Sequence, residues 1–166
     1  KRFVSGKLTH PHQDEARRLE ATLGQKPQAI VLSCSDSRVP PEVIFDQGIG
    51  DLFIIRVAGN TLGAAQVASI EYAVAHLGTR LIAVMGHESC GAVNAAARTP
   101  ANESVGSRDL DSLVASIRPS FEDLSEADLK KHLDDKKLNH LVKSNVNYVA
   151  EWLVKQKPGG TVYFLG

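Results

Sequence analysis

The sequence contains few cysteines, no excess charge of either sign and no long hydrophobic run. Only Cys34 and Cys90 are present, whereas small secreted domains held by disulfides normally carry about four or more, so that class is disfavoured. Nineteen basic side chains balance nineteen acidic ones, which argues against a surface built to bind nucleic acid or a charged membrane. No apolar run approaches the roughly 18 residues that a membrane-spanning helix needs. We therefore expect neither a nucleic-acid partner nor a membrane partner.

The beginning of the chain also lacks an initiator methionine and the apolar core of a signal peptide. It starts with Lys1-Arg2-Phe3, so we expect a trimmed or processed product. We expect a cytoplasmic protein, and a periplasmic or secreted location stays open because the start is trimmed.

The composition is that of a globular domain. Hydrophobic residues make up 43% and charged residues 23% of the 166 residues, a length that suits one domain rather than two. We expect a single domain over residues 1–166, in which residues 1–24 form an N-terminal helical arm. Residues 99–137 are more polar, with Pro100 and Pro119 as helix breakers, and are expected to form surface helices and loops.

Short apolar runs alternate with helical patterns along the chain. Four runs predict buried strands, at residues 29–32, 52–57, 81–85 and 161–165. Between the second and third runs, apolar side chains recur at helical steps from Val67 to Leu77, which predicts a helix with Gly78 at its C-terminal cap. Another helical pattern begins at Leu138. This alternation predicts an α/β fold with a central, mostly parallel β-sheet flanked by helices.

The two cysteines come directly after predicted strands. Cys34 follows the first strand, and His87 and Cys90 follow the third in Gly-His-Glu-Ser-Cys-Gly. Because the carboxyl ends of parallel strands lie along one edge of a sheet, both clusters can meet at one site. Thiolate and imidazole are ligands that zinc prefers, and three protein ligands leave a fourth position, as in catalytic zinc sites. For each cluster alone, the alternative is an inert buried cysteine and a surface histidine.

Asp36 and Arg38 lie two residues apart, close after Cys34. Their carboxylate and guanidinium can form a bidentate pair if the backbone turns. Asp36 is near enough to Cys34 to reach the same metal. It can either fill the fourth position or, held by Arg38, leave that position to water. A purely structural ion pair that locks the loop is the alternative.

With these residues the sequence resembles the β-class carbonic anhydrases. The resemblance is carried by Cys34-Ser35-Asp36-Ser37-Arg38 and by His87 and Cys90, and segments 45–48, 56–60 and 70–74 also resemble the family. It extends from about Arg2 to Gly166. It implies a Zn2+ enzyme that converts carbon dioxide reversibly to bicarbonate and a proton. It also implies a dimer as the smallest stable unit, so we expect a homodimer or tetramer.

The resemblance assigns roles to single residues as well. It implies that Cys34, His87 and Cys90 are the metal ligands and that Asp36 and Arg38 form a catalytic dyad, with Asp36 as a further candidate ligand. It also implies a substrate pocket made by Gln25, Phe53, Tyr72 and Gly91.

The charge of these ligands indicates how such a site works. Two thiolates and a neutral imidazole neutralise the zinc dication, so bound water should be less acidic than in a three-histidine site, where its pKa is about 7. Activity is then expected to rise toward alkaline pH as zinc-bound water becomes hydroxide, which attacks carbon dioxide beside Phe53 and Tyr72. Asp36, oriented by Arg38, would accept a hydrogen bond from the hydroxide, and Gln25 would donate one to the developing bicarbonate.

Four other interpretations compete with this one. A hydrolase of carbon disulfide or carbonyl sulfide would use the same ligands, and a non-catalytic zinc domain would keep Asp36 as a permanent fourth ligand. A nucleotide-binding loop at residues 59–63 lacks the G-x-G-x-x-G spacing. A Cys90 nucleophile with His87 as its base would leave Cys34 without a role. The other histidines are expected at the surface, namely His10, His12, His76, His132 and His140.

Overall fold

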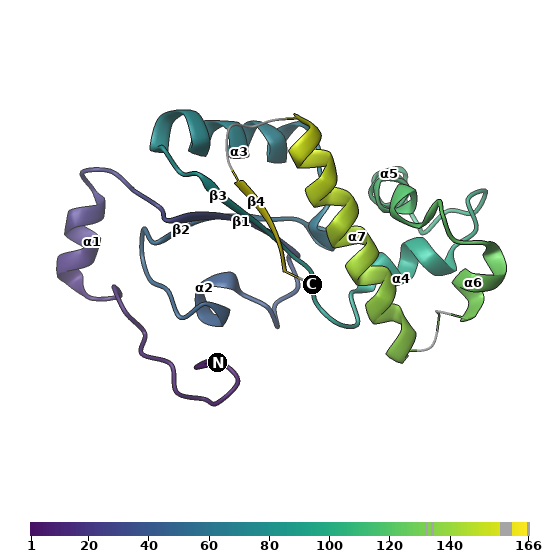
Figure 1. Ribbon diagram of the computed structural model, residues 1–166, viewed down its shortest axis with the longest axis horizontal. Coiled ribbons are helices and arrows are strands. Elements are labelled where there is room, and N and C mark those ends of the chain that lie inside the picture. Colours follow the sequence, from purple (N-terminus) through teal and green to yellow (C-terminus); the bar gives the residue numbers. More distant parts are fainter. Residues whose placement is uncertain (132, 134, 157–160, 166) are drawn as a thin grey trace.

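A parallel sheet forms the centre of the molecule, with helices on both of its faces (Figure 1). The computed structural model describes residues 1–131, 133, 135–156 and 161–165, with the backbone alone at residues 126, 130, 135–137 and 161–165. The N-terminal arm extends to one side of the sheet, and most of the shorter helices gather on the other (Figure 1).

The sheet contains the four strands that the apolar runs predict. They are β1 (Ala29–Ser33), β2 (Leu52–Arg56), β3 (Leu81–Met85) and β4 (Thr161–Leu165). Their order is β2-β1-β3-β4 and each neighbouring pair is parallel, so the predicted α/β fold is confirmed. Ser33 lies opposite both Arg56 and Met85, which places the carboxyl ends of β1, β2 and β3 at one level.

Two long helices, α3 (Ala64–Leu77) and α7 (Asp135–Gln156), cover one face of the sheet. Gly78 ends α3 in the left-handed conformation with φ 71°, as its position predicts. The core here is made of side chains from three strands and both helices, including Ile30, Leu32, Ile82, Val84, Ile70, Val146 and Leu153. In the described part of the chain, no helix has both the length and the apolar composition needed to cross a bilayer.

A much smaller element covers the opposite face. The short helix α2 (Pro41–Ile44) and the residues around it pack on Val31, Ala83 and Met85, on the side of the sheet away from α3 (Figure 1).

A second apolar cluster lies beyond the carboxyl ends of the strands. It is built by α4 (Gly91–Arg98), α5 (Arg108–Ile117), the 3-10 helix η2 (Arg118–Phe121) and the first half of α7, and it includes both cysteines. The expectation that residues 99–137 lie at the surface is therefore wrong for Val114, Ile117 and Phe121, which are buried. One face of α5 is apolar at helical spacing, and this face packs on α4. The helix α6 (Glu126–Lys131) follows η2.

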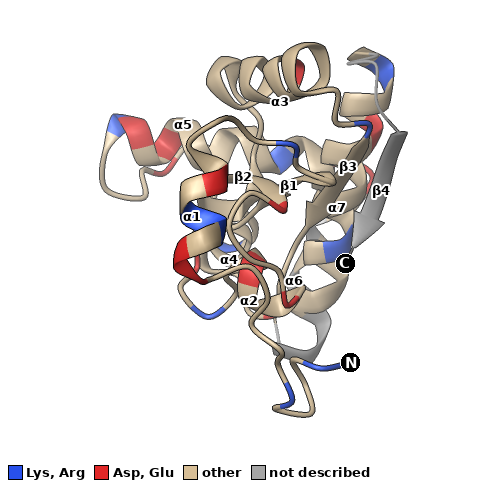
Figure 2. Cartoon of the chain, turned by 90° about the vertical axis from the view of Figure 1, so that its left-hand side faces the viewer, with Lys and Arg blue, Asp and Glu red and all other residues tan. Residues whose placement is uncertain are grey.

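The N-terminal arm contains the short helix α1 (Glu15–Ala21), and the residues before it are turns and extended chain. Two buried carboxylates between α2 and β2 hold the arm. Asp46 accepts hydrogen bonds from the Thr9 and His10 amides and pairs with Arg2, and Asp51 pairs with the His12 ring at 2.7 Å. Acidic and basic side chains are mixed on α1, so this side of the molecule carries no field of one sign (Figure 2).

Candidate metal centre

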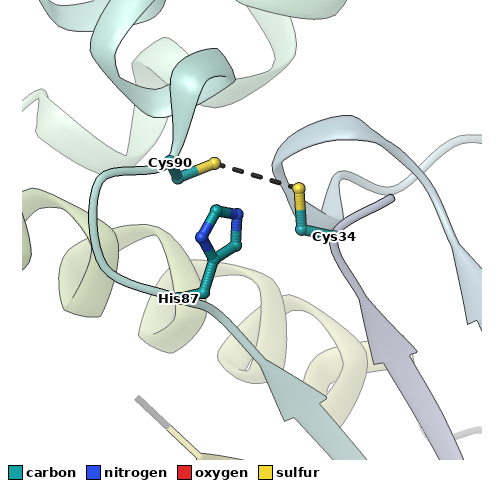
Figure 3. A group of neighbouring side chains, drawn as sticks. All are labelled: Cys34, His87 and Cys90. Carbon is teal, nitrogen blue, oxygen red and sulfur yellow. Dashed lines mark hydrogen bonds between the residues drawn. The ribbon is translucent and has the colours of Figure 1, made fainter. Parts of the chain in front are cut away.

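Three side chains with metal-binding atoms converge beyond the ends of β1 and β3 (Figure 3). The sulfurs of Cys34 and Cys90 and a ring nitrogen of His87 all lie within 4.8 Å of one another, and the two sulfurs are 4.0 Å apart. Cys34 follows β1, whereas His87 and Cys90 belong to the turn between β3 and α4. The structure thus brings together the two clusters that the sequence places at neighbouring strand ends.

The turn between β3 and α4 has a backbone suited to this convergence. Ser89 takes the left-handed conformation with φ 55°, and Cys90 is extended immediately before α4 begins. Gly86 opens the turn against α7, where a Cβ atom would lie 2.7 Å from a methyl carbon of Val146 and 2.8 Å from one of Val142. Glycine at this position therefore allows α7 to close over the turn that carries both ligands.

The hydrogen bonds of His87 leave one ring nitrogen for a metal. Its Nδ1 lies 2.9 Å from the carbonyl oxygen of Glu88 and donates to it, which places the neutral ring's lone pair on Nε2. Nε2 is buried and has no hydrogen-bond partner. A buried nitrogen without a partner is costly unless something binds it, and a metal ion between the two sulfurs would do so. The donor set of two sulfurs and one imidazole fits zinc.

Cys34 and Cys90 are 5% and 2% exposed, and their sulfurs lie within hydrogen-bonding distance of each other. A hydrogen bond from Cys90 lowers the pKa of Cys34, and the backbone amides of Asp36 and Gly59 act in the same direction against the effect of burial. The same hydrogen bond, together with burial, raises the pKa of Cys90. These shifts favour a thiolate at Cys34, and a dication bound there would displace the remaining proton.

Asp36 and Arg38 form the bidentate pair that their spacing allows. Nε and Nη2 of Arg38 donate to the two carboxylate oxygens at 2.9 and 2.8 Å, and the Arg38 amide donates to Oδ1 at 3.0 Å. These hydrogen bonds hold the pKa of Asp36 well below its usual range. Asp36 lies outside the three-residue cluster, with Oδ2 3.8 Å from Nε2 of His87.

Two further polar residues support Cys34, and no sequence pattern predicted a role for either of them. Arg56, the last residue of β2, donates to the carbonyl oxygens of Cys34 and Asp36 at 3.0 and 2.6 Å. Asn145 of α7 donates to the carbonyl of Gly59 at 2.8 Å, and the Gly59 amide lies 3.4 Å from the sulfur of Cys34. Gly59 belongs to the 3-10 helix η1 (Ala58–Asn60).

Comparison with known proteins identifies the fold and the family. The carbonic anhydrase family profile matches residues 29–159. One of two tetrameric β-carbonic anhydrases from Sordaria macrospora superimposes with a TM-score of 0.77 at 26% identity, covering 89% of this chain and 78% of that one. The chain belongs to the β-carbonic anhydrase family.

Curated carbonic anhydrases are more similar in sequence over shorter spans. Carbonic anhydrase 2 of Mycobacterium tuberculosis is 54% identical over 95 residues, which cover 57% of this chain and 46% of that protein. The carbonic anhydrase of Mycolicibacterium smegmatis is 45% identical over 120 residues, covering 72% of this chain and 58% of that protein. The chain thus spans about half the length of the curated relatives it matches.

The four residues that the family resemblance assigns to a substrate pocket do not gather at one place. Gly91 follows Cys90 as the first residue of α4. Gln25 is exposed and precedes β1, at the end of that strand opposite to Cys34. Phe53 lies opposite Ile30, earlier in the sheet, and its ring centroid is 6.4 Å from that of Tyr72 on α3. Within one chain, only Gly91 is adjacent to the cluster.

Among the described residues, the other histidines lie apart from the cluster. His10, His12, His76 and His140 are exposed, as expected, and His132 lies outside the described residues. The ring of His76 is 5.1 Å from that of Tyr72.

Proposed function

We propose that this protein catalyses the reversible hydration of carbon dioxide to bicarbonate and a proton, with one zinc ion per chain. The buried cluster of Cys34, His87 and Cys90 carries the proposal, because His87 Nε2 has no partner there and the Asp36 carboxylate lies beside it. Zinc held by these three residues would acidify a water molecule and so supply the nucleophile. Membership of the β-carbonic anhydrase family supports this function.

Asp36 acts as a hydrogen-bond acceptor in this proposal. Arg38 donates to both of its oxygens, so the carboxylate is ionised at neutral pH and is held in one orientation. An ionised carboxylate can accept a hydrogen bond from the attacking oxygen and aim that oxygen's lone pair at the substrate carbon. Arg38 also draws the carboxylate away from the metal position, which leaves that position open for water.

We propose that a second copy of the chain completes the substrate pocket. Gln25, Phe53 and Tyr72 lie too far along the sheet to line the cluster of their own chain, yet Tyr72 is 49% exposed and free to face a neighbour. The arm also exposes large apolar side chains, with Val4 at 88% and Leu23 at 91%. Burying these residues and the edge of β2 against another copy favours a homodimer or a tetramer.

Metal analysis combined with stopped-flow hydration of carbon dioxide tests the proposal. Purified protein should contain about one zinc per chain, and the rate per bound zinc should increase toward alkaline pH, because two thiolates reduce the acidity of bound water. Cys34→Ser should lose both metal and activity. Ser112→Ala, an exposed change on α5, serves as the control. Zinc-loaded protein that hydrates no carbon dioxide but hydrolyses carbonyl sulfide or carbon disulfide would refute the proposal.

A further inference from the structure

Arg56 reaches from the end of β2 across the end of β1 to the segment that carries Cys34 and Asp36. Its Nε donates to the carbonyl oxygen of Cys34 at 3.0 Å, and its Nη2 donates to that of Asp36 at 2.6 Å. The sheet register explains the reach, because Arg56 lies directly opposite Ser33, the residue before Cys34. One planar guanidinium thus joins two carbonyl oxygens that are two residues apart.

These two carbonyls bracket the part of the backbone that sets the direction of the Asp36 side chain. The peptide after Cys34 and the peptide after Asp36 are both fixed, so the intervening backbone has little freedom to rotate. Arg38 fixes the same residue from its carboxylate end. Arg38 is 61% exposed, however, whereas Arg56 is partly buried against the loop. Of the two arginines that fix Asp36, Arg56 is therefore the less exposed to solvent.

In the part of the chain that the structure describes, Arg56 forms no ion pair with a carboxylate. Partial burial removes water from the guanidinium, and no opposite charge beside it offsets this desolvation cost, so the contact adds little to stability. Lysine could not reproduce the contact, since a single ammonium lacks the fork that reaches two carbonyls in one plane. Arg56 therefore orients the backbone of residues 34–36 and does not neutralise a carboxylate.

We propose that Arg56 is a positioning residue that holds the backbone of residues 34–36 so that Asp36 faces Arg38 and does not ligate the metal. The proposal rests on the function proposed above. Arg56 donates to backbone carbonyl oxygens and to none of the three metal-binding side chains, so it acts by positioning Asp36. Without it, the peptide on either side of Asp36 can rotate and the carboxylate can swing toward the position that water should take.

The test compares Arg56→Met and Arg56→Lys with Arg118→Met. Arg118 is a matched control because its guanidinium also donates to two carbonyl oxygens, those of Thr99 and Pro100, away from the cluster. Zinc content should stay near one per chain in all three variants, since the three ligands are intact. Both Arg56 variants should lose about 10–100-fold in kcat/KM per bound zinc, as is typical when a residue that orients a metal site is removed. Arg118→Met should keep the wild-type kcat/KM per bound zinc.

Cobalt substitution supplies a measurement that does not depend on activity. With Arg56 present, the visible spectrum of the cobalt protein should change with pH, because solvent occupies the fourth position. In Arg56→Met the carboxylate replaces solvent, so this pH dependence should be lost, and Asp36→Asn added to Arg56→Met should restore it. The two changes should also be non-additive in kcat/KM, because they act through one group.

Several results would overturn the proposal. A cobalt spectrum of Arg56→Met that titrates like the wild type would refute it, as would rates per zinc that match Arg118→Met. If Arg56→Met does not fold, Arg56→Lys decides the matter, and wild-type values in that variant count against the proposal. If the wild-type protein hydrates no carbon dioxide, the proposed function fails, while the cobalt spectra still show whether Arg56 controls Asp36.

Discussion

Replacing Gly59 by alanine tests how tightly the segment beside Cys34 is packed. Gly59 has a φ of 67°, and a Cβ atom there would lie 2.7 Å from the δ-methyl carbon of Ile117 and 3.1 Å from Cβ of Ala92. The left-handed conformation costs an alanine about 1–2 kcal/mol. Ile117 is fully buried, so its methyl group can move only by displacing other core atoms, which costs about 1–3 kcal/mol more. The free energy of unfolding should therefore fall by about 2–5 kcal/mol.

Gly78→Ala separates the two contributions. Gly78 has almost the same conformation, with a φ of 71°, but a Cβ atom there would have no neighbour within 4 Å. Its replacement should therefore cost only the backbone strain of about 1–2 kcal/mol. Denaturant unfolding of both metal-free variants, at one protein concentration, measures the difference. Equal losses of unfolding free energy in the two variants would refute the predicted steric cost, because the Ile117 side chain would then have moved aside without destabilising the core.

Gly59 also links packing to metal binding. Its amide lies 3.4 Å from the sulfur of Cys34, so an alanine that displaces this peptide should weaken zinc binding as well. Gly78→Ala should leave the affinity for zinc unchanged, because the end of α3 is remote from the cluster. Competition with a chromogenic chelator would measure both affinities.

Three further predictions concern the dyad, the assembly and the arm. Arg38→Ala and Asp36→Asn should each retain zinc but lose about 100-fold or more in hydration rate per bound zinc. If the dyad only locks the loop, both variants should instead be less stable and hydrate carbon dioxide at near-normal rates. Mixing inactive Asp36→Asn with inactive Tyr72→Ala and allowing the subunits to exchange should restore activity if the pocket is shared between copies; a mixture that stays inactive would place the pocket within one chain. Burial alone would raise the pKa of Asp51, but hydrogen bonds from the Gly48 amide and His12 outweigh burial and lower it. The ionised Asp51 therefore stabilises the fold at pH values above the usual carboxyl pKa, and this contribution is lost as the pH falls through the lowered pKa. Urea unfolding should therefore show a larger stability loss for Asp51→Asn at about pH 7 than at about pH 3, and equal losses at both would contradict the assignment.

The strands and the three clustered side chains were predictable because both follow from local sequence. Central parallel strands are buried on both faces and so appear as unbroken apolar runs, as in residues 29–32. Residues directly after such runs lie at one edge of the sheet, which is sufficient to bring Cys34 to His87 and Cys90. The Asp36–Arg38 pair is equally local, since its partners are two residues apart.

The residues that support the site were not predictable in the same way. Arg56 lies 22 residues from Cys34, and Asn145 lies 86 residues from Gly59, so their contacts depend on strand register and on how α7 packs. Weak signals did exist. Arg56 is a charged residue at the end of an apolar strand, and Asn145 is a polar residue at a buried position of an otherwise apolar helix face. Each such residue needs a polar partner, but the sequence alone does not identify it.

The supporting contacts imply that the cluster is arranged by the fold and not by the metal. Ser33 and Met85, at the ends of neighbouring strands, fix the spacing of the two ligand segments, and the Glu88 carbonyl orients the ring of His87. The core between the sheet and the helices α3 and α7 contains none of the three candidate ligands, so the burial of its apolar side chains does not depend on zinc. Small zinc domains differ, because there the metal itself provides most of the folding free energy. In this chain a metal would bind to a site that the fold has already arranged. Arg38 and Arg56 could then hold Asp36 out of the coordination position, because a carboxylate that had to assemble the site could not also be kept away from it.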